Sequence, residues 1–170
     1  MTRRRRPLLL AAAGVLALAS WGGAFLSPGR AAAQTARPGA AFTTPLPGSA
    51  ERKAILDALR APVQKTLKQR PVVFKVDHLR VRGEWAFLSA VPEQPNGKAM
   101  NYRGTVYQQA IREGAFDNWV CALLRREGPA GGRQRWRVVT YVLGATDVAW
   151  DGWDRRYHAP RAVFPYAGKG

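Results

Sequence analysis

The chain has 170 residues, with 27 lysines and arginines against 11 aspartates and glutamates and a formal charge of +16. Because 46% of the residues are hydrophobic and only 22% are charged, the composition excludes a disordered or fibrous chain and fits one folded domain. The single cysteine, Cys121, excludes an intramolecular disulfide and a thiolate zinc cage, so a packed core must supply the stability.

The first 33 residues have the pattern of a secretory signal peptide. Four arginines precede an apolar run from Leu8 to Leu26, and three alanines at 31–33 offer small residues for cleavage. We expect cleavage after Ala33 and an exported protein, periplasmic or secreted, with the arginine pair also allowing the twin-arginine route. An uncleaved membrane anchor is the alternative, because a transmembrane helix needs about 20 apolar residues.

The positive charge has two interpretations. Residues 1–33 hold five arginines and no acidic residue, so 22 basic residues still face 11 acidic ones after their removal. The 21 arginines outnumber the 6 lysines, and glycine and proline are abundant. This balance fits the amino-acid bias of a GC-rich genome as well as it fits selection for binding an anionic partner, and both interpretations stay open.

Residues 34–49 carry Pro38, Pro45 and Pro47 and are expected to form a flexible linker, followed by one domain over 50–166 and a tail over 167–170. From Glu51 to Gln69, apolar residues recur at spacings of three and four, which predicts an amphipathic helix with Ser49 as its N-cap. Proline 62 lies inside this helix, so we expect a kink or a split there, and the continuous apolar stripe favours the kink.

Four later runs are rich in branched and aromatic residues and predict strands: Val72–Val81, Trp85–Val91, Trp119–Arg126 and Arg135–Leu143. They form two hairpins, with a three-residue turn at 82–84 and a glycine-rich turn at 128–132. Alternation in the last run predicts Trp136, Val138 and Val142 on one face and Tyr141 and Leu143 on the other.

Two short helices complete the prediction. Residues Thr105 to Glu113 have helical spacing and are followed by Gly114, a natural helix terminator. A last helix is expected to begin at Asp147 and to carry one aromatic face. That face consists of Trp150, Trp153 and Tyr157.

Together these elements predict an α+β fold in which a kinked N-terminal helix packs on a curved four-stranded antiparallel sheet. This order resembles the cystatin or nuclear-transport-factor architecture. The segments GATDVAW (144–150), RYHAPRAVF (156–164) and WAF (85–87) also resemble a group of small exported bacterial proteins with no assigned activity. The resemblance implies export and this fold, and it carries over no catalytic residue.

The sequence assigns no catalytic residue, metal or cofactor. The two histidines, His78 and His158, have no ligand spacing around them. The aspartate beside His78 points to the other face of a strand, and Cys121 lies among apolar residues as an inert thiol. An enzymatic activity is therefore not the leading hypothesis.

The leading hypothesis is a non-enzymatic binding module for an anionic envelope polymer, lipid head group or protein partner. Guanidinium groups recognise phosphate and carboxylate oxygens, and five of them surround the second hairpin: Arg125, Arg126, Arg133, Arg135 and Arg137. Export and the lack of a binding signature argue against nucleic acid, and membrane contact is expected only through an uncleaved signal segment. The alternative is a small-ligand or enzymatic pocket between helix and sheet, with Asp77, His78 and Glu113.

Overall fold

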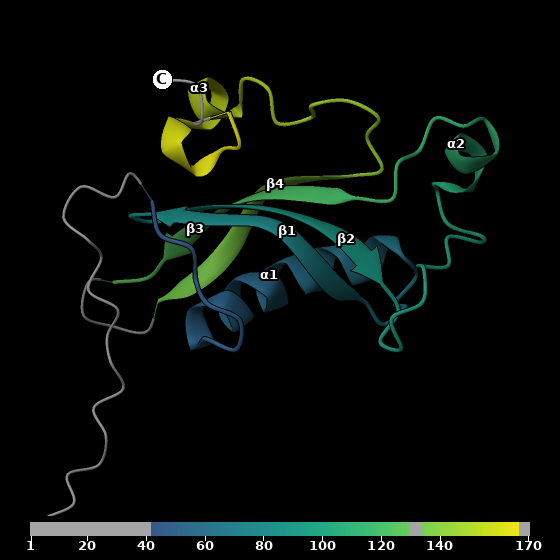
Figure 1. Cartoon of the computed structure of the whole chain (residues 1–170), viewed down its shortest axis with the longest axis horizontal. Coiled ribbons are helices and arrows are strands. Elements are labelled where there is room, and N and C mark those ends of the chain that lie inside the picture. The colour runs from purple at the N-terminus through teal and green to yellow at the C-terminus, as the bar shows by residue number, and fades with distance from the viewer. Residues whose placement is uncertain (1–41, 130–133, 167–170) are drawn as a thin grey trace, which may run out of the picture. The chain divides into compact units, whose positions relative to one another are not determined.

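The computed structural model of the chain describes residues 42–129 and 134–166, and it has the predicted α+β fold (Figure 1). The expected signal peptide, the linker before Phe42, Arg133 and the tail lie outside the described residues. The elements follow in the order α1 (Ala50–Thr66), β1 (Val73–Arg82), β2 (Trp85–Glu93), α2 (Gln108–Arg112), β3 (Val120–Glu127), β4 (Arg135–Leu143), α3 (Trp153–Tyr157) and the 3₁₀ turn η1 (Arg161–Val163).

The four strands form one antiparallel sheet in chain order, β1-β2-β3-β4, and each predicted strand is confirmed to within two residues at either end. The first hairpin is tighter than expected. Since Arg82 pairs with Trp85, only Gly83 and Glu84 form the loop, and Gly83 has a positive φ of 58°. Glycine adopts this conformation without the steric cost that a Cβ would bring.

Helix α1 begins where the sequence predicts, because the Ser49 side chain accepts a hydrogen bond from the Arg52 amide at 3.3 Å. The helix runs without a break through Pro62, so the split considered from the sequence does not occur. It ends at Thr66, three residues earlier than predicted. Lys68 and Gln69 both have positive φ, and the Gln69 amide donates back to the Gln64 carbonyl, which closes the helix.

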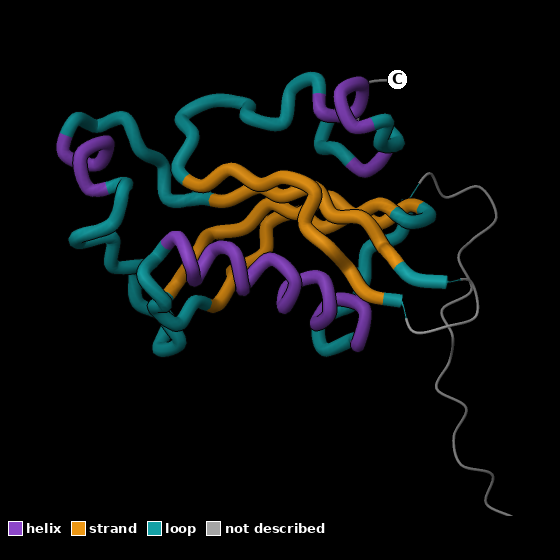
Figure 2. Tube along the Cα trace, turned by 180° about the vertical axis from the view of Figure 1, so that it is seen from behind, coloured by secondary structure: helices purple, strands orange, loops and turns teal. Residues whose placement is uncertain are grey.

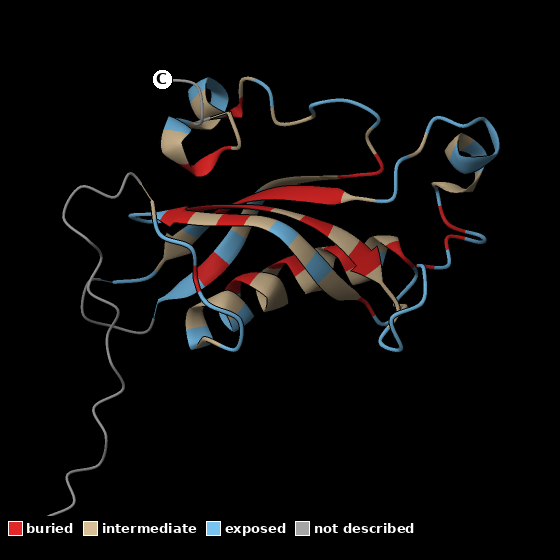
Figure 3. Cartoon of the chain, in the orientation of Figure 1, coloured by how far each residue is buried: buried red, intermediate tan, exposed pale blue. Residues whose placement is uncertain are grey.

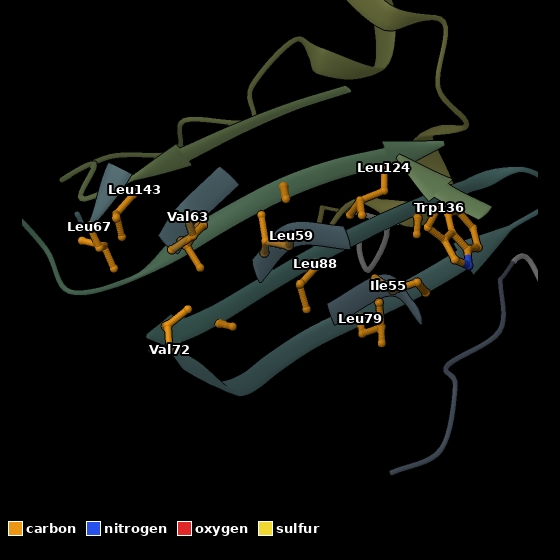
Figure 4. Packing of buried hydrophobic residues seen from close by; sticks show 14 of the residues in the cluster. Ile55, Leu59, Val63, Leu67, Val72, Leu79, Leu88, Leu124, Trp136 and Leu143 are labelled. Atoms are coloured by element: carbon orange, nitrogen blue, oxygen red, sulfur yellow. The ribbon is translucent and has the colours of Figure 1, made fainter. Parts of the chain in front are cut away.

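The main core lies between α1 and one face of the sheet (Figure 4). Buried side chains of α1, four positions apart, meet buried side chains from all four strands. The labelled members in Figure 4 are Ile55, Leu59, Val63, Leu67, Val72, Leu79, Leu88, Leu124, Trp136 and Leu143. Burial of these apolar side chains is the main source of stability for the domain.

A second core covers the other face of the sheet, where the C-terminal segment 145–166 packs (Figure 2). Buried residues therefore occur on both sides of the sheet (Figure 3). From the sheet come Phe87, Cys121 and Leu123, and from the segment come Trp153 and Phe164. Phe87 is the centre of this core, since its ring contacts those of Trp153 and Phe164 at centroid distances of 6.5 and 5.1 Å.

Two β-bulges change which side chains face which core. In β4 the pairing skips Val139, so Tyr141 and Leu143 lie on the α1 face and Val142 lies on the other face. The simple alternation predicted for this strand is wrong beyond Val138, because one extra residue reverses the facing of all that follow. In β1 the pairing skips Asp77 in the same way.

Both short helices are shorter than predicted. Helix α2 covers only Gln108–Arg112, and Val106, expected on its apolar face, lies before it and is 78% exposed. The C-terminal helix begins at Trp153 rather than near Asp147, after turns that end at Gly152 with a positive φ. In both places the chain turns before a regular helix can begin.

The folded part also begins earlier than predicted. Thr43 forms two backbone hydrogen bonds with Val81, at 2.7 and 2.8 Å, and Pro45 is buried. Strand β1 lies at the edge of the sheet, so its outward N–H and C=O groups are free to take an added segment. The end of the expected linker, residues 42–49, therefore packs on the domain.

Candidate functional site

The hairpin arginines divide between the two faces of the sheet. Arg125 pairs with Arg137 and Glu127 pairs with Arg135, so these side chains share the face that carries the C-terminal segment. Arg126 pairs with Trp136, which belongs to the core under α1. The sequence grouped these residues by proximity alone, and the register separates them because neighbours on a strand point to opposite faces.

Three of the four positions in one cross-strand row are arginines. Arg82, Trp85, Arg125 and Arg137 are paired in succession across β1, β2, β3 and β4. We call these four residues the arginine row. The Arg125 guanidinium lies 5.3 Å from the centre of a Trp85 ring, within the range of a cation–π contact. Because the tryptophan is buried, it gives Arg125 a rigid aromatic base.

Two carboxylates accompany the row. Arg125 forms an ion pair with Glu84 at 2.7 Å, and Arg137 forms a longer one with Glu127 at 3.5 Å. The Arg137 side chain is 72% exposed, and ion pairs of this kind are worth about 0–1 kcal/mol. Within the described ranges no carboxylate lies in ion-pair distance of Arg135. A competing anion can therefore replace these carboxylates at little cost.

A depression of about 380 Å³ lies over three members of the arginine row, Trp85, Arg125 and Arg137, whereas Arg82 is not part of its lining. The sheet supplies its floor, and Tyr157 of α3 forms one wall. Its lining combines two guanidinium groups with aromatic and aliphatic surface: Trp85, Arg125, Glu127, Arg137, Val138, Val139 and Tyr157. Such a lining can hold an anionic group and the apolar part of the molecule that carries it.

Arg126 has a different environment from the other hairpin arginines. Its guanidinium is ion-paired with Glu51 at the start of α1 and lies 4.7 Å from the centre of a Trp136 ring. These contacts join α1 to the hairpin. Arg126 is therefore engaged in contacts within the fold, and its assignment to the anion site stays a prediction.

The three residues of the alternative pocket do not come together between helix and sheet. In the described ranges, the buried residues in that space are hydrophobic. Asp77 is exposed at the bulge in β1, and Glu113 is exposed after α2, where it accepts a hydrogen bond from Gln109. His78 faces the C-terminal segment, with Nε2 3.3 Å from the Val163 carbonyl oxygen. The bulge turns this histidine away from α1.

The single cysteine is buried, and the acidic residues of the described ranges form no metal-binding group. Burial raises the pKa of the Cys121 thiol to about 12, so the thiol stays protonated and unreactive. In residues 42–129 and 134–166 no three histidine, cysteine, aspartate or glutamate side chains gather as metal ligands. The same ranges contain no helix that is long and apolar enough to cross a bilayer.

Comparisons of the chain with protein-family models, with curated protein sequences and with solved structures find no match. The resemblance to the cystatin and nuclear-transport-factor architectures therefore gains no support from relatives. The α+β class depends on the helices and strands themselves.

Sequence reasoning missed three members of the site. Arg82 and Trp85 flank the first hairpin turn, and Tyr157 comes from α3. A two-residue turn at 83–84 would have placed Arg82 opposite Trp85, since such turns fix the register of the flanking residues. No local signal identifies Tyr157, because the packing of the C-terminal segment on the sheet brings it there.

Proposed function

We propose that the domain is a non-enzymatic binding module of the cell envelope, and that the arginine row together with Arg135 binds an anionic component. The component is an envelope polymer, a lipid head group or a partner protein that presents phosphate or carboxylate groups. The observation that carries this proposal is the placement of Arg82, Arg125 and Arg137 on one face of the sheet, in one row with Trp85. Their fields add at the depression above the tryptophan.

Geometry supports binding rather than catalysis at this place. The depression is lined by arginines, aromatic rings and aliphatic side chains, and the one carboxylate in its lining, Glu127, is paired with Arg137. General acid–base catalysis needs a group whose pKa is near the working pH, and arginine stays protonated throughout that range. The site is therefore suited to holding charge.

Export to the envelope belongs to the same proposal and depends on the signal-like residues 1–33. Outside the cytoplasm, phosphate-rich and carboxylate-rich surface polymers and lipid head groups are available to a basic protein. The charge that remains without residues 1–33, 22 basic against 11 acidic residues, favours association with them.

The proposal is tested by binding of the purified protein to two defined probes, long-chain polyphosphate and phosphatidylglycerol vesicles, with neutral phosphatidylcholine vesicles for comparison. Because the Debye length falls to about 8 Å at 0.15 M salt, binding through exposed arginines weakens strongly between about 0.02 and 0.3 M. Retention on an anionic probe at low salt and release at high salt is expected. Equal retention on neutral vesicles, or no retention on either anionic probe at low salt, contradicts the proposal.

A further inference from the structure

A second basic depression, of about 580 Å³, lies where the end of α1 meets the connection between β2 and β3, residues 94–119, which we call the crossover segment. It shares no residue with the arginine row. Its lining consists of Lys65, Thr66 and Lys68 from α1 and the residues after it, with Gly104, Thr105 and Val106 from the crossover. The two ammonium groups are the only charged groups in this lining.

The two lysines differ from Arg125, Arg126 and Arg137 in having no acidic partner. Within the described part of the chain, neither Lys65 nor Lys68 lies in ion-pair distance of a carboxylate. Both are exposed. An incoming anion therefore meets two positive charges in the same depression that no carboxylate neutralises beforehand.

The backbone at Lys68 has a left-handed conformation, which is energetically unfavourable for a residue with a side chain. Lys68 has a φ of 54° at the end of α1, a position where glycine is the usual residue. Its ammonium group lies close to the crossover, since a Cβ built on Gly104 would stand 3.6 Å from Lys68 Nζ. A lysine in a left-handed conformation at a site that glycine would stabilise suggests a function for its side chain.

The crossover side of the depression is fixed as well. Arg70 donates hydrogen bonds to the carbonyl oxygens of Asn101 and Arg103, both at 2.7 Å, which ties this loop to the end of α1. Thr105 is buried, and its hydroxyl donates to the Tyr102 carbonyl at 2.7 Å. The loop is therefore held in position beside the lysines before a ligand binds.

We infer that this depression is a second ligand site, and that it takes a phosphomonoester group between Lys65 and Lys68. Lysine acts as a compact point charge, whereas planar carboxylates are matched by the arginine fork. A phosphomonoester has a second pKa of about 6 and is mainly a dianion at neutral pH, so it attracts two ammonium groups more strongly than a carboxylate does. The exposed Val106 side chain offers an apolar contact for the organic part of the ligand.

The test follows the amide chemical shifts of Gly104, Thr105 and Val106 in the full chain at low salt. The probes are inorganic phosphate, glycerol 3-phosphate and, as the carboxylate comparison, acetate. Saturable shifts with both phosphates, and much weaker ones with acetate, are expected. Vesicles that contain phosphatidic acid distinguish a lipid source from a soluble one. Equal responses to acetate and phosphate, or no response to any phosphate probe, overturn the inference.

Three variants locate the site. Lys65→Gln and Lys68→Gln are each expected to weaken phosphate binding about tenfold, since a hydrogen bond to a charged group is lost. The matched control is Lys75→Gln, an exposed lysine of β1 whose strand neighbours Phe74 and Val76 face α1. Phosphate binding of this control should equal that of the parent.

Lys68→Gly separates binding from folding. Glycine suits the positive φ, so this variant is expected to unfold at a higher denaturant concentration than the parent while binding phosphate about tenfold more weakly. Parent-like phosphate affinity in both Lys68→Gly and Lys65→Gln contradicts the site. The arginine row is intact in all these variants, so failure here leaves the proposed function of that row unaffected.

Discussion

Gly144 and Phe116 are packed so closely that a side chain on the glycine has no room. A Cβ on Gly144 would lie 2.2 Å from Phe116 Cε2, and Gly144 has a positive φ of 88°. The Gly144 amide also donates to the Trp119 carbonyl at 2.9 Å, which anchors the residue after β4 beside the start of β3. This contact joins the crossover segment to the sheet.

Gly144→Ala is therefore expected to destabilise the domain by about 2–4 kcal/mol, from overpacking against Phe116 together with the left-handed backbone. Denaturant unfolding measures the change. Gly97→Ala is the matched control, because Gly97 also has a positive φ, of 78°, but nothing lies within 4 Å of its added Cβ. Equal losses in the two variants would show that Phe116 does not crowd Gly144.

Trp153→Ala is expected to lower the free energy of unfolding by about 3–5 kcal/mol, the usual range for removing a large buried aromatic side chain. Trp153 is 6% exposed and packs against Phe87 and Tyr157 in the second core. Val148→Ala in the same segment is the comparison, since Val148 is exposed. A loss below about 1 kcal/mol for Trp153→Ala would mean that the C-terminal segment does not bury this ring.

Stability is expected to fall as the pH decreases below neutrality, with His78 as one cause. Desolvation by burial lowers the pKa of His78 below its usual 6.5, and Arg80 lowers it further, while the hydrogen bond with the Val163 carbonyl opposes the shift. The unfolded chain then binds a proton at a higher pH than the folded domain does. The stability that neutral His78 allows is fully present above pH about 6.5 and is lost as the pH falls from there through the lower pKa of the folded domain.

His78→Gln tests this dependence, because glutamine stays uncharged and can still donate to Val163. Free energies of unfolding at several pH values between neutrality and acid should decrease less steeply for this variant than for the parent. Direct titration of the His78 ring by NMR gives a second measurement. A pKa above 6.5 in the folded domain would reverse the sign and disprove the prediction.

Cleavage after Ala33 is expected on export, and it would leave a chain that begins at Gln34. Intact-mass measurement of the protein recovered from its own envelope fraction tests this. Recovery of only the uncleaved chain, in the membrane fraction, would support the anchor instead.

The sequence predicts the strands better than the site. Branched and aromatic runs locate all four strands because their signal is local. The bulges at Asp77 and Val139 depend on the pairing register between neighbouring strands. The sequence around His78 and Tyr141 therefore does not predict which face of the sheet these side chains are on. The short extent of α2 and α3 likewise depends on packing around the turns that precede them.

For the site, residue type alone selects the arginines, and pairing decides their roles. Arg126 lies next to Arg125 in sequence, yet its partner is Glu51, which is 75 positions away. Arg82 belongs to the row because it is opposite Trp85 across the first turn. Neither relationship can be derived without the register of the sheet.

The most direct measurement compares two triple variants in binding to polyphosphate and phosphatidylglycerol vesicles at low salt. One variant replaces Arg125, Arg135 and Arg137 with glutamine. The other replaces the exposed residues Lys75, Lys98 and Arg112 with glutamine, which removes the same charge from positions outside the second hairpin. Both should keep nearly the parent's free energy of unfolding, since exposed charges contribute about 0–1 kcal/mol each.

The arginine variant is expected to bind the anionic probe that the parent binds about tenfold more weakly than the parent does, because three exposed contacts are lost. The affinity of the charge-matched variant should stay close to that of the parent. Equal weakening in both variants would show that net charge alone drives binding. Parent-like affinity of the arginine variant would show that these arginines are only solvated, and either result contradicts the arginine row as the binding site.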